Sequence, residues 1–351
     1  MKGAPGEMKP TTDLILRLEK VTKTYRTKGG RFGQAGSRVV ALNRISLDVR
    51  RGEIFGLVGE SGSGKTTAGR LVVRLEEADA GEIFVAGTRV PELKGRRLKQ
   101  FRRKVQMVFQ DPYQSLNPQR SIFDTVSEPL VIHRMGNGAQ RREAVAQALK
   151  SVGLSPPEDF FLRYPHQLSG GQRQRVAMAR AMVLGPEFVV ADEPTSMLDA
   201  SISAQIFNIL LHMRDKLGVT LLFITHSLAA ARYLCDRIAV IYRGNLMEVG
   251  EAGEVIERPR HPYTQALLDA LPRFGQCGAV RRYNTLLGAE RPASQGVGCA
   301  FYSRCGVAQR LLCSTQAPSL RELAPGHRVA CHYAEGPEAG TATTEACFYA
   351  T

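Results

Sequence analysis

A glycine-rich run at residues 59–66 carries the clearest chemistry in this 351-residue sequence. It reads G-E-S-G-S-G-K-T and fits the phosphate-loop pattern G-x-x-x-x-G-K-[ST] at every fixed position. Glycines at these positions let several backbone N–H groups point at one anion, and the helix expected to begin near Lys65 adds the positive end of its dipole. A chance glycine-rich turn would lack the apolar strand before this run and the helical pattern after it. The sequence therefore predicts a loop that binds nucleotide phosphates.

The residues of this loop have different expected roles. Lys65 is expected to reach the β- and γ-phosphates, the Thr66 hydroxyl to bind Mg²⁺, and Thr67 to support the α-phosphate. The full set of predicted nucleotide contacts in the loop is Gly59, Ser61, Gly62, Gly64, Lys65, Thr66 and Thr67.

Two adjacent carboxylates follow another apolar run. Residues 188–193 read F-V-V-A-D-E and end in Asp192 and Glu193. Ligands of an open α/β sheet lie at the carboxyl ends of its strands. Asp192 is therefore expected to hold Mg²⁺, directly or through water, and Glu193 to polarise an attacking water molecule. The alternative is a pair of surface carboxylates with no shared role.

The elements that must position these residues alternate between strand and helix. Short apolar runs have the length of buried strands at residues 54–58, 188–191, 221–225 and 238–242. A strand-like alternation near the start of the chain involves Leu14, Leu16 and Leu18. Helical spacing is present at 140–152 and from Ser169 onward, and an apolar helix stripe over 201–217 contains Ile202, Ile206, Ile209, Leu210, Met213 and Leu217. This order is typical of an α/β fold with a mostly parallel sheet.

The composition is typical of a globular protein, and its positive net charge implies an acidic partner. Hydrophobic residues make up 43% of the chain, charged residues 23%, and the net charge is +14. Nucleic acid, anionic lipid headgroups and nucleotide phosphates all fit this charge. Residues 94–104 contain seven Lys and Arg. A solvated helix face is the expected structure there, with contact to nucleic acid or lipid as the alternative.

Membrane insertion is not expected from the sequence. No apolar run approaches the roughly 18 residues of a membrane-spanning helix. The N-terminus, M-K-G-A-P-G-E-M-K-P, lacks the apolar core of a signal peptide. The chain is therefore expected to stay in the cytosol and to meet a membrane at its surface or through partners.

A short motif between the phosphate loop and the acidic pair narrows the family. Phosphate loops alone are shared by kinases, GTPases and helicases, but residues 168–172 read L-S-G-G-Q, the signature of ABC ATPases. Ser169 and the N–H groups of Gly170 and Gly171 would open a helix and form an anion site. The chain resembles the ABC ATPases. This resemblance implies that two subunits sandwich two ATP molecules, with Ser169 and Gly171 of one subunit contacting the ATP of the other.

Further motifs of that family occur in the expected order. The resemblance assigns Gln110 to the loop that links the γ-phosphate and Mg²⁺ to the membrane partner, and Asp199 to a contact across the dimer. It assigns His226 to a γ-phosphate contact and Tyr25 to stacking on adenine. Taken singly, such a glutamine is usually a turn residue, such a histidine a structural residue and such a tyrosine a packing residue. Together they predict that the catalytic groups are Glu193, His226, Gln110 and Lys65.

Two positions depart from the family pattern. Ser227 follows the histidine where the family usually has Asp, and Met197 replaces a common Ala before Asp199. Neither change removes a catalytic group.

Longer stretches resemble the importers of dipeptides and oligopeptides. Residues 105–130 resemble that group, residues 261–268 read H-P-Y-T-Q-A-L-L like the start of its C-terminal extension, and residues 296–332 resemble the remainder. The run S-L-N-P…S-E-P-L favours the F-type of its two ATPases. This implies a second related ATPase, two membrane permease subunits and an extracytoplasmic solute-binding protein, with the chain at the cytoplasmic face of the membrane. The same group includes importers of nickel and of oligosaccharides, which remain alternatives.

Other ABC classes fit the sequence less well. A DNA-repair or chromosome ATPase would explain the basic charge, but it needs a long coiled coil between phosphate loop and signature that the sequence lacks. Translation-associated members carry two ATPase modules, and exporters usually fuse membrane helices to the module. A nucleic-acid partner is therefore not expected.

The expected organisation has four parts. Residues 1–10 are expected to be a disordered leader, residues 11–257 the ABC ATPase domain, residues 258–335 the C-terminal extension and residues 336–351 a flexible tail. Residues 27–38 are expected to form a basic surface loop. The resemblance implies a phosphate-loop core, an N-terminal β-subdomain and a helical subdomain around Gln110 and the signature.

Four of the seven cysteines crowd into the extension. Cys299, Cys305, Cys313 and Cys331 have the spacing C-x5-C-x7-C-x17-C, whereas Cys235, Cys277 and Cys347 are scattered. Four thiolates complete an all-cysteine site for either an iron–sulfur cluster or zinc, and a metal would cross-link a segment with little apolar periodicity. Disulfides and unligated thiols are less expected in the cytosol. The resemblance to peptide-importer ATPases favours a structural 4Fe–4S cluster, with Zn²⁺ as the alternative.

Overall fold

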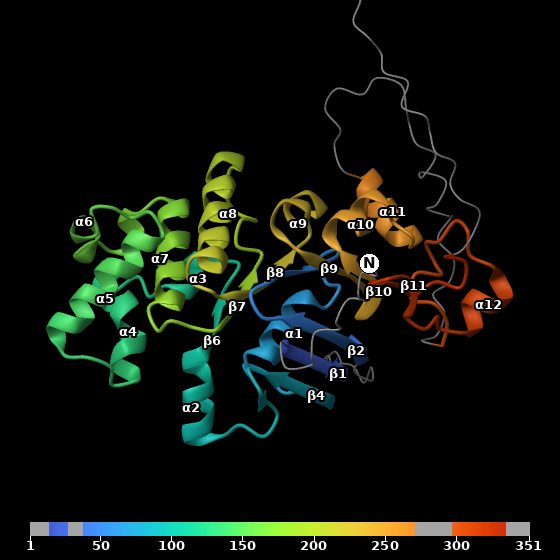
Figure 1. Ribbon diagram of the computed structural model, residues 1–351, viewed down its shortest axis with the longest axis horizontal. Coiled ribbons are helices and arrows are strands. Elements are labelled where there is room, and N and C mark those ends of the chain that lie inside the picture. Colours follow the sequence, from blue (N-terminus) through green and yellow to red (C-terminus); the bar gives the residue numbers. More distant parts are fainter. Residues whose placement is uncertain (1–13, 27–37, 271–296, 335–351) are drawn as a thin grey trace, which may run out of the picture.

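The computed structural model describes residues 14–26, 38–270 and 297–334 (Figure 1). The predicted leader, residues 27–37 of the predicted loop, the predicted tail, Cys277 and Cys347 lie outside these residues, whereas Arg38, the last residue of that predicted loop, begins a strand. Within them, no helix combines the length and apolarity required to cross a bilayer.

The central sheet has eight strands in the order β11-β12-β10-β9-β3-β8-β7-β6. Its parallel part runs from β9 to β6 and contains every strand predicted from a short apolar run. Each residue of β3, β7 and β8 is buried, because helices cover one face of this part of the sheet, and helix α1 (Lys65–Val72) and an antiparallel sheet cover the other. The strands are β3 (Ile54–Val58), β6 (Val105–Val108), β7 (Phe188–Asp192), β8 (Thr220–Thr225), β9 (Arg237–Tyr242), β10 (Asn245–Glu251), β11 (Arg321–Ala324) and β12 (His327–Val329). The predicted α/β fold with a mostly parallel sheet is confirmed.

A second, antiparallel sheet lies below the central sheet in Figure 1 and has the order β2-β1-β4-β5. The strand expected from the leucine alternation is confirmed, and it extends well beyond Leu18. β2 was not predicted. Its residues Ile45, Leu47 and Val49 alternate with polar ones, but the alternation breaks before Ile45, where the pairing with β1 shifts register. The strands are β1 (Leu14–Arg26), β2 (Arg38–Arg50), β4 (Ala80–Val85) and β5 (Thr88–Arg89).

The helices fall into those that cover the central sheet and those that form a separate group. In Figure 1 the group of α3 to α7 lies at one end of the molecule, and α1 lies beside the strands at its centre. The helices are α1 (Lys65–Val72), α2 (Gly95–Lys104), α3 (Pro112–Ser115), α4 (Ile122–Ile132), α5 (Gly138–Ser151), α6 (Glu158–Phe161), the 3₁₀ turn η2 (Pro165–Gln167), α7 (Gly170–Met182), α8 (Ala200–Asp215), α9 (Leu228–Leu234), α10 (Ala252–Glu257), α11 (Pro262–Asp269) and α12 (Arg310–Thr315).

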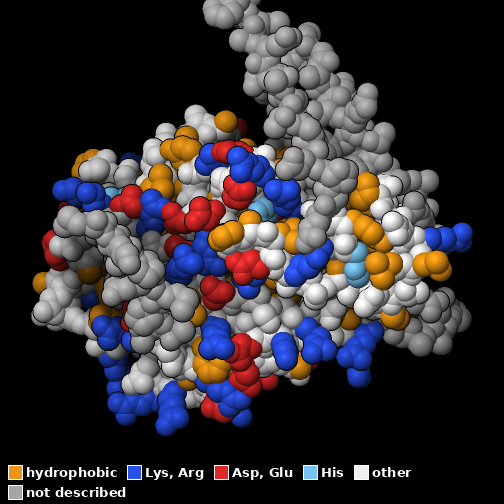
Figure 2. Space-filling model, turned by 45° about the vertical axis from the view of Figure 1, so that its right-hand side comes forward, with side chains coloured by type: hydrophobic (Ala, Val, Ile, Leu, Met, Phe, Trp, Pro, Cys, Tyr) orange, Lys and Arg blue, Asp and Glu red, His pale blue; other side chains and the backbone are white. Residues whose placement is uncertain are grey.

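Two of these helices test expectations from the sequence. α2 buries only Phe101, so its basic residues face solvent as expected. Figure 2 shows Lys and Arg side chains along the lower rim of the molecule, the level of α2 in Figure 1, whereas over the middle of this face they alternate with Asp and Glu. The stripe on α8 buries Ile206, Leu210 and Met213, but Leu217 lies beyond the helix end and is 48% exposed. The chain leaves the helix there because Gly218 adopts a left-handed backbone with φ of 67°.

The extension joins the central sheet. β12 pairs with β10, which carries the fully buried Glu248. Its carboxylate accepts hydrogen bonds from the backbone N–H groups of Arg260 (2.7 Å) and His261 (3.1 Å) and lies 2.7 Å from Nε2 of His327. A buried carboxylate needs such partners, so Glu248 ties both ends of the extension to the core.

Candidate nucleotide-binding site

The predicted site residues follow four neighbouring strands of the parallel sheet. The phosphate loop follows β3, His226 follows β8, Asp192 and Glu193 lie at the end of β7, and Gln110 comes after β6. Since these strands are parallel and adjacent in the order β3-β8-β7-β6, their carboxyl ends meet at one edge of the sheet. Residues far apart in the chain are thereby brought to one place.

Glycine is required at specific positions of the phosphate loop. A Cβ atom on Gly59 would lie 2.2 Å from the carbonyl oxygen of Ile241, and one on Gly64 would lie 2.2 Å from that of Ala41. Gly62 and Gly64 also have φ values of 75° and 105°, in the left-handed region. The loop therefore bends as expected and passes close to the backbone of two neighbouring strands, which the motif alone does not reveal.

The Lys65 side chain is folded back over its own loop. Its Nζ donates hydrogen bonds to the carbonyl oxygens of Gly59 and Glu60, both at 2.8 Å, and lies 3.8 Å from Oε1 of Glu193. Burial lowers the pKa of Lys65, while Glu193 and Asp192 oppose that shift. The loop thus presents a buried cation beside two carboxylates, the charge pattern that an incoming phosphate with a metal ion would complement.

Thr66 and Asp192 form a pair of oxygen ligands. The Thr66 hydroxyl donates a hydrogen bond to Oδ1 of Asp192 at 3.0 Å, and Asp192 is only 2% exposed. Burial raises the pKa of Asp192, and the hydrogen bond from Thr66 opposes this. A hydroxyl and a carboxylate side by side suit Mg²⁺, so these residues fit the predicted metal role.

Glu193 is the residue on which the predicted catalytic groups converge. Its Oε2 lies 3.3 Å from Nε2 of Gln110 and 3.1 Å from Nδ1 of His226, and its Oε1 faces Lys65. The Glu193 backbone has a φ of 43°, which side-chain-bearing residues rarely adopt. The amide of Gln110 points to this carboxylate rather than to Asp192. A carboxylate held in this way can act as a general base toward water.

Tyr25 and Thr67 lie near the other end of the phosphate loop. The Tyr25 hydroxyl hydrogen-bonds the carboxylate of Glu76, and the ammonium of Lys23 lies 5.4 Å from the centre of the Tyr25 ring. Burial raises the pKa of Tyr25, with the hydrogen bond to Glu76 adding to the shift and Thr67 opposing it. The ring is 37% exposed, so a face remains available to a planar group.

The signature residues are placed away from the phosphate loop of the same chain. Ser169 caps α7: its Oγ accepts a hydrogen bond from the N–H of Gln172 at 3.2 Å. A Cβ on Gly171 would lie 2.6 Å from the Ile202 side chain, and Asp199 directly precedes α8 without a side-chain hydrogen bond that caps the helix. Within the described part of the chain, no hydrogen bond or ion pair joins these residues to the phosphate loop, and Figure 1 shows α7 and α1 well separated. Their predicted role, toward the ATP of a second subunit, stays a prediction.

The two residues that depart from the family pattern lie outside the contacts around Glu193. Ser227 caps α9, because its Oγ accepts a hydrogen bond from the N–H of Ala230 at 3.2 Å. Met197 is 59% exposed. Neither side chain takes part in the contacts around Glu193.

The four clustered cysteines line one small pocket. Cys299, Cys305, Cys313 and Cys331 surround a residual space of about 10 Å³, and the N–H of Cys299 donates to the carbonyl of Cys313 at 2.8 Å. The described cysteines are free thiols. Burial raises the pKa of Cys299 to about 11 and of Cys305 to about 12, and it also raises the pKa of Cys331. Among the described residues, no group of three or more His, Cys, Asp or Glu side chains is placed so that it could hold a metal ion.

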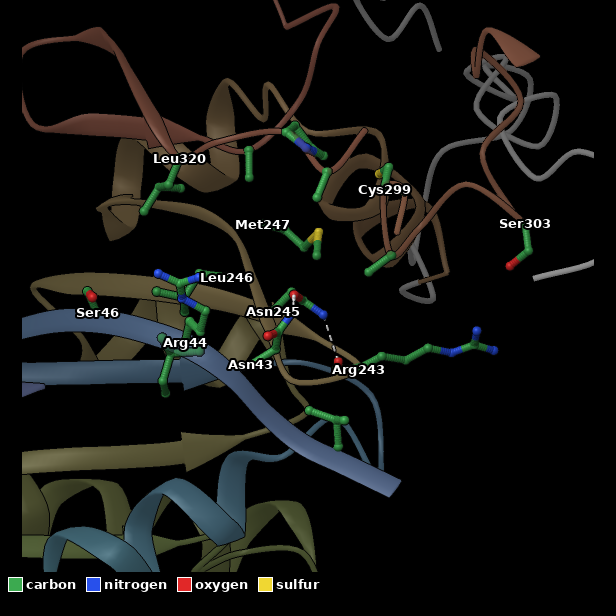
Figure 3. A pocket seen from close by; sticks show the side chains of 17 residues that line it. Asn43, Arg44, Ser46, Arg243, Asn245, Leu246, Met247, Cys299, Ser303 and Leu320 are labelled. Carbon is green, nitrogen blue, oxygen red and sulfur yellow. Dashed lines mark hydrogen bonds between the residues drawn. The ribbon is translucent and has the colours of Figure 1, made fainter. Parts of the chain in front are cut away.

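A larger cavity lies beside this pocket. It has a volume of about 520 Å³ and separates β2 and β10 from the extension (Figure 3). Asn43 and Asn245 lie at its floor and are joined by a hydrogen bond of 2.9 Å, while the Arg243 side chain extends away from it. Cys299 lines both spaces, whereas the other three clustered cysteines line only the smaller pocket.

Sequence reasoning missed one set of contacts to the phosphate loop. Glu60 is bonded by Tyr263 and Arg304, which belong to the extension. Neither residue stands out in the sequence, and Arg304 lies 244 positions from Glu60. No local signal could have identified this pairing.

The sequence matches two known protein-family descriptions. Residues 42–196 match "ABC transporter", and residues 247–313 match "Oligopeptide/dipeptide transporter, C-terminal region". The first range contains the phosphate loop, the signature and the acidic pair, and the second contains Tyr263, Arg304 and three of the clustered cysteines.

Similar proteins cover almost the whole chain. The oligopeptide transport ATP-binding protein AppF of Bacillus subtilis (strain 168) is 42% identical over 323 residues, covering 91% of this chain and 97% of that protein. The di/tripeptide transport ATP-binding protein DppF of Pseudomonas aeruginosa (strain UCBPP-PA14) is 41% identical over 323 residues, with coverages of 92% and 98%. A solved dimeric bacterial ABC transporter cassette has a TM-score of 0.60 and 32% identity, covering 68% of this chain and 98% of that one.

Proposed function

The chain belongs to the ATP-binding proteins of the oligopeptide and dipeptide ABC transporters, and from this membership we propose that it hydrolyses ATP to power peptide import. The ABC ATPase fold and the ATPase activity follow from the family itself. The observation that carries the proposal is the convergence of Lys65, Gln110 and His226 on Glu193, beside a complete phosphate loop. The similar proteins are named as peptide import and di/tripeptide transport ATP-binding proteins, which supports peptide as the solute.

Each group around the site has a distinct proposed task. Glu193 accepts a proton from water as it attacks the γ-phosphate, while Lys65 and His226 bind the oxygens of that phosphate. Thr66 and Asp192, with Gln110, would hold Mg²⁺, which neutralises phosphate charge when bound. The N–H groups of the phosphate loop hold the remaining oxygens, and Tyr25 stacks on adenine.

The signature residues complete the site of a second subunit in this proposal. Ser169, Gly171 and Asp199 would contact the ATP held by a partner ATPase, so that ATP closes the dimer and hydrolysis reopens it. The F-type resemblance supports a partner chain that is related rather than identical. The complex would also contain two permease subunits and an extracytoplasmic solute-binding protein, with this chain at the cytoplasmic face of the membrane.

A surface next to Gln110 supports the permease contact. A cavity of about 400 Å³ is lined by α3, the following loop and α4. Tyr113 on α3 is 57% exposed, and the guanidinium of Arg173 lies 3.8 Å from its ring centre and donates to its hydroxyl at 2.6 Å. Because Arg173 belongs to the signature helix α7, a permease segment here would touch both the Gln110 loop and that helix.

The complex itself tests this function. The tagged chain, purified with its partners from the native membrane, should bring down a second ATPase, two permeases and a binding protein. In vesicles, peptide-loaded binding protein should stimulate ATP hydrolysis, whereas nickel and oligosaccharides should not. If only nickel or only an oligosaccharide stimulates hydrolysis, that solute and not peptide is the substrate. A fully active homodimer would contradict the pairing with a second, related ATPase.

We further propose that the cysteine pocket holds a 4Fe–4S cluster with a structural role. Four thiols line one pocket, with Cys313 on α12 and Cys331 shortly after β12, and this supports an all-cysteine donor set. The raised pKa values of Cys299, Cys305 and Cys331 mean that binding must displace protons. Anaerobically purified protein is expected to contain about four iron and four sulfide per chain, with the broad visible absorption of such a cluster.

Replacement of one ligand checks this metal prediction. Cys313→Ser should abolish the bound iron and visible absorption, whereas Cys235→Ser, which alters a buried cysteine outside the pocket, should leave both unchanged. If the protein is colourless and contains one zinc per chain, the four cysteines bind zinc and not an iron–sulfur cluster. Four free thiols without metal would contradict both.

A further inference from the structure

Glu60 lies inside the phosphate loop, and all three of its polar groups have partners. Its N–H donates to the Tyr263 hydroxyl at 3.0 Å, and its carbonyl accepts from Nζ of Lys65 at 2.8 Å. Its carboxylate accepts two hydrogen bonds from Nη1 of Arg304, at 3.1 and 2.8 Å. The loop residue that contacts the phosphate-binding lysine is thus held by two residues of the extension.

Tyr263 is fixed by the packing around its ring. It is fully buried, its ring centre lies 4.6 Å from that of Tyr242 and 5.3 Å from that of Phe301. Phe301 is also fully buried and meets Tyr242 edge-on at 5.3 Å. Because one ring comes from the core strand β9 and two come from the extension, this cluster sets the position of the Tyr263 hydroxyl relative to the phosphate loop.

Arg304 connects the same loop to the cysteine pocket. It immediately precedes Cys305, whose N–H donates to the carbonyl of Phe301 at 3.1 Å. The Arg304 guanidinium also lies 5.7 Å from the ring centre of Tyr242. The turn that presents a clustered cysteine therefore also presents the cation that pairs with Glu60.

We propose that Tyr263 and Arg304 are positioning residues for the phosphate loop, through which the extension sets the affinity for MgATP. The Glu60 carboxylate would repel phosphate if it turned toward the nucleotide, and Arg304 both neutralises it and directs it away. The Tyr263 hydroxyl fixes the first turn of the loop. The inference rests on the proposed nucleotide binding, but it assigns a role to residues that do not touch the nucleotide.

Arginine replacement is the first test. Arg304→Ala is expected to weaken MgATP binding about tenfold, measured by titration calorimetry, and to raise KM more than it lowers kcat. Arg304→Lys should restore part of the affinity. Arg328→Ala is the matched control, because Arg328 is also in the extension, is equally exposed at 31% and pairs with Asp48 instead of the phosphate loop.

Two further variants separate positioning from general destabilisation. Tyr263→Phe keeps the buried ring and removes only the hydroxyl, so it should weaken MgATP binding about three- to fivefold with little change in the unfolding temperature. Glu60→Gln combined with Arg304→Ala should bind MgATP no more weakly than Arg304→Ala alone, since both act through one carboxylate.

The outcomes distinguish this inference from the proposed function. If the unmodified chain fails to bind MgATP, the proposed function itself is wrong. If it binds, but Arg304→Ala and Tyr263→Phe bind equally well, the positioning role is overturned. It is also overturned if the effects of Glu60→Gln and Arg304→Ala simply add, or if Arg328→Ala weakens binding as much as Arg304→Ala does.

Discussion

Glu193→Gln is expected to lower the rate of ATP hydrolysis by about 10²- to 10⁴-fold while MgATP still binds. Gln keeps the shape of the side chain and can still face Gln110 and His226, but an amide cannot accept the proton of the attacking water. Lys65 and the loop N–H groups, which hold the phosphates, are left in place. The variant should therefore collect in the ATP-bound, closed dimer.

Single-turnover experiments measure the rate of ATP hydrolysis, and gel filtration with MgATP measures whether the closed dimer accumulates. Glu187→Gln is a suitable control, because Glu187 lies just before β7 and forms surface ion pairs with Arg51 and Lys104. That change should leave hydrolysis within about twofold. Normal turnover by Glu193→Gln would show that another group activates the water.

Lys65→Ala is expected to act on binding first, raising the Kd for MgATP about 100-fold. The variant loses the cation that faces the phosphates and leaves Glu193 without the ammonium group that lies 3.8 Å from its Oε1. Hydrolysis at saturating nucleotide should also fall, but the change in Kd distinguishes this variant from Glu193→Gln.

Titration with MgATP and MgADP measures that loss. Lys104→Ala provides the control, because the Lys104 side chain is 57% exposed, lies at the end of α2 and pairs with Glu187 rather than with the phosphate loop. It should bind nucleotide like the unmodified chain. Tight binding by Lys65→Ala would mean that the loop N–H groups hold the phosphates without help from the lysine.

The sequence predicted those parts of the site whose structure depends on a short stretch of neighbouring residues. Gly59 to Thr66 follow a motif whose spacing requires one backbone path, and the apolar runs before Lys65 and Asp192 have the length of buried strands. Once those strands are parallel neighbours, His226 and Gln110 must approach Glu193, because all of them follow strands with the same direction.

Other features depend on contacts that no short stretch of sequence encodes. The pairing of Glu60 with Arg304 joins residues 244 positions apart, and β12 joins the sheet beside β10 only after the chain has passed through the extension. β2 was not predicted, because only its second half, Ile45 to Val49, alternates, and a register shift interrupts the pattern before Ile45. Leu217 continued the helix pattern, but the left-handed Gly218 ends the helix before it.

The pairing of β12 with β10 also has a consequence for aggregation. Five of the seven residues of β10 are buried, and without β12 this strand would become the edge of the central sheet with unpaired N–H and C=O groups. Apolar edges of that kind recruit strands from other molecules. The actual edge is the four-residue β11, which is short and carries Arg321 and Glu322. By pairing with β10, the extension therefore removes an edge along which two copies of this chain could pair.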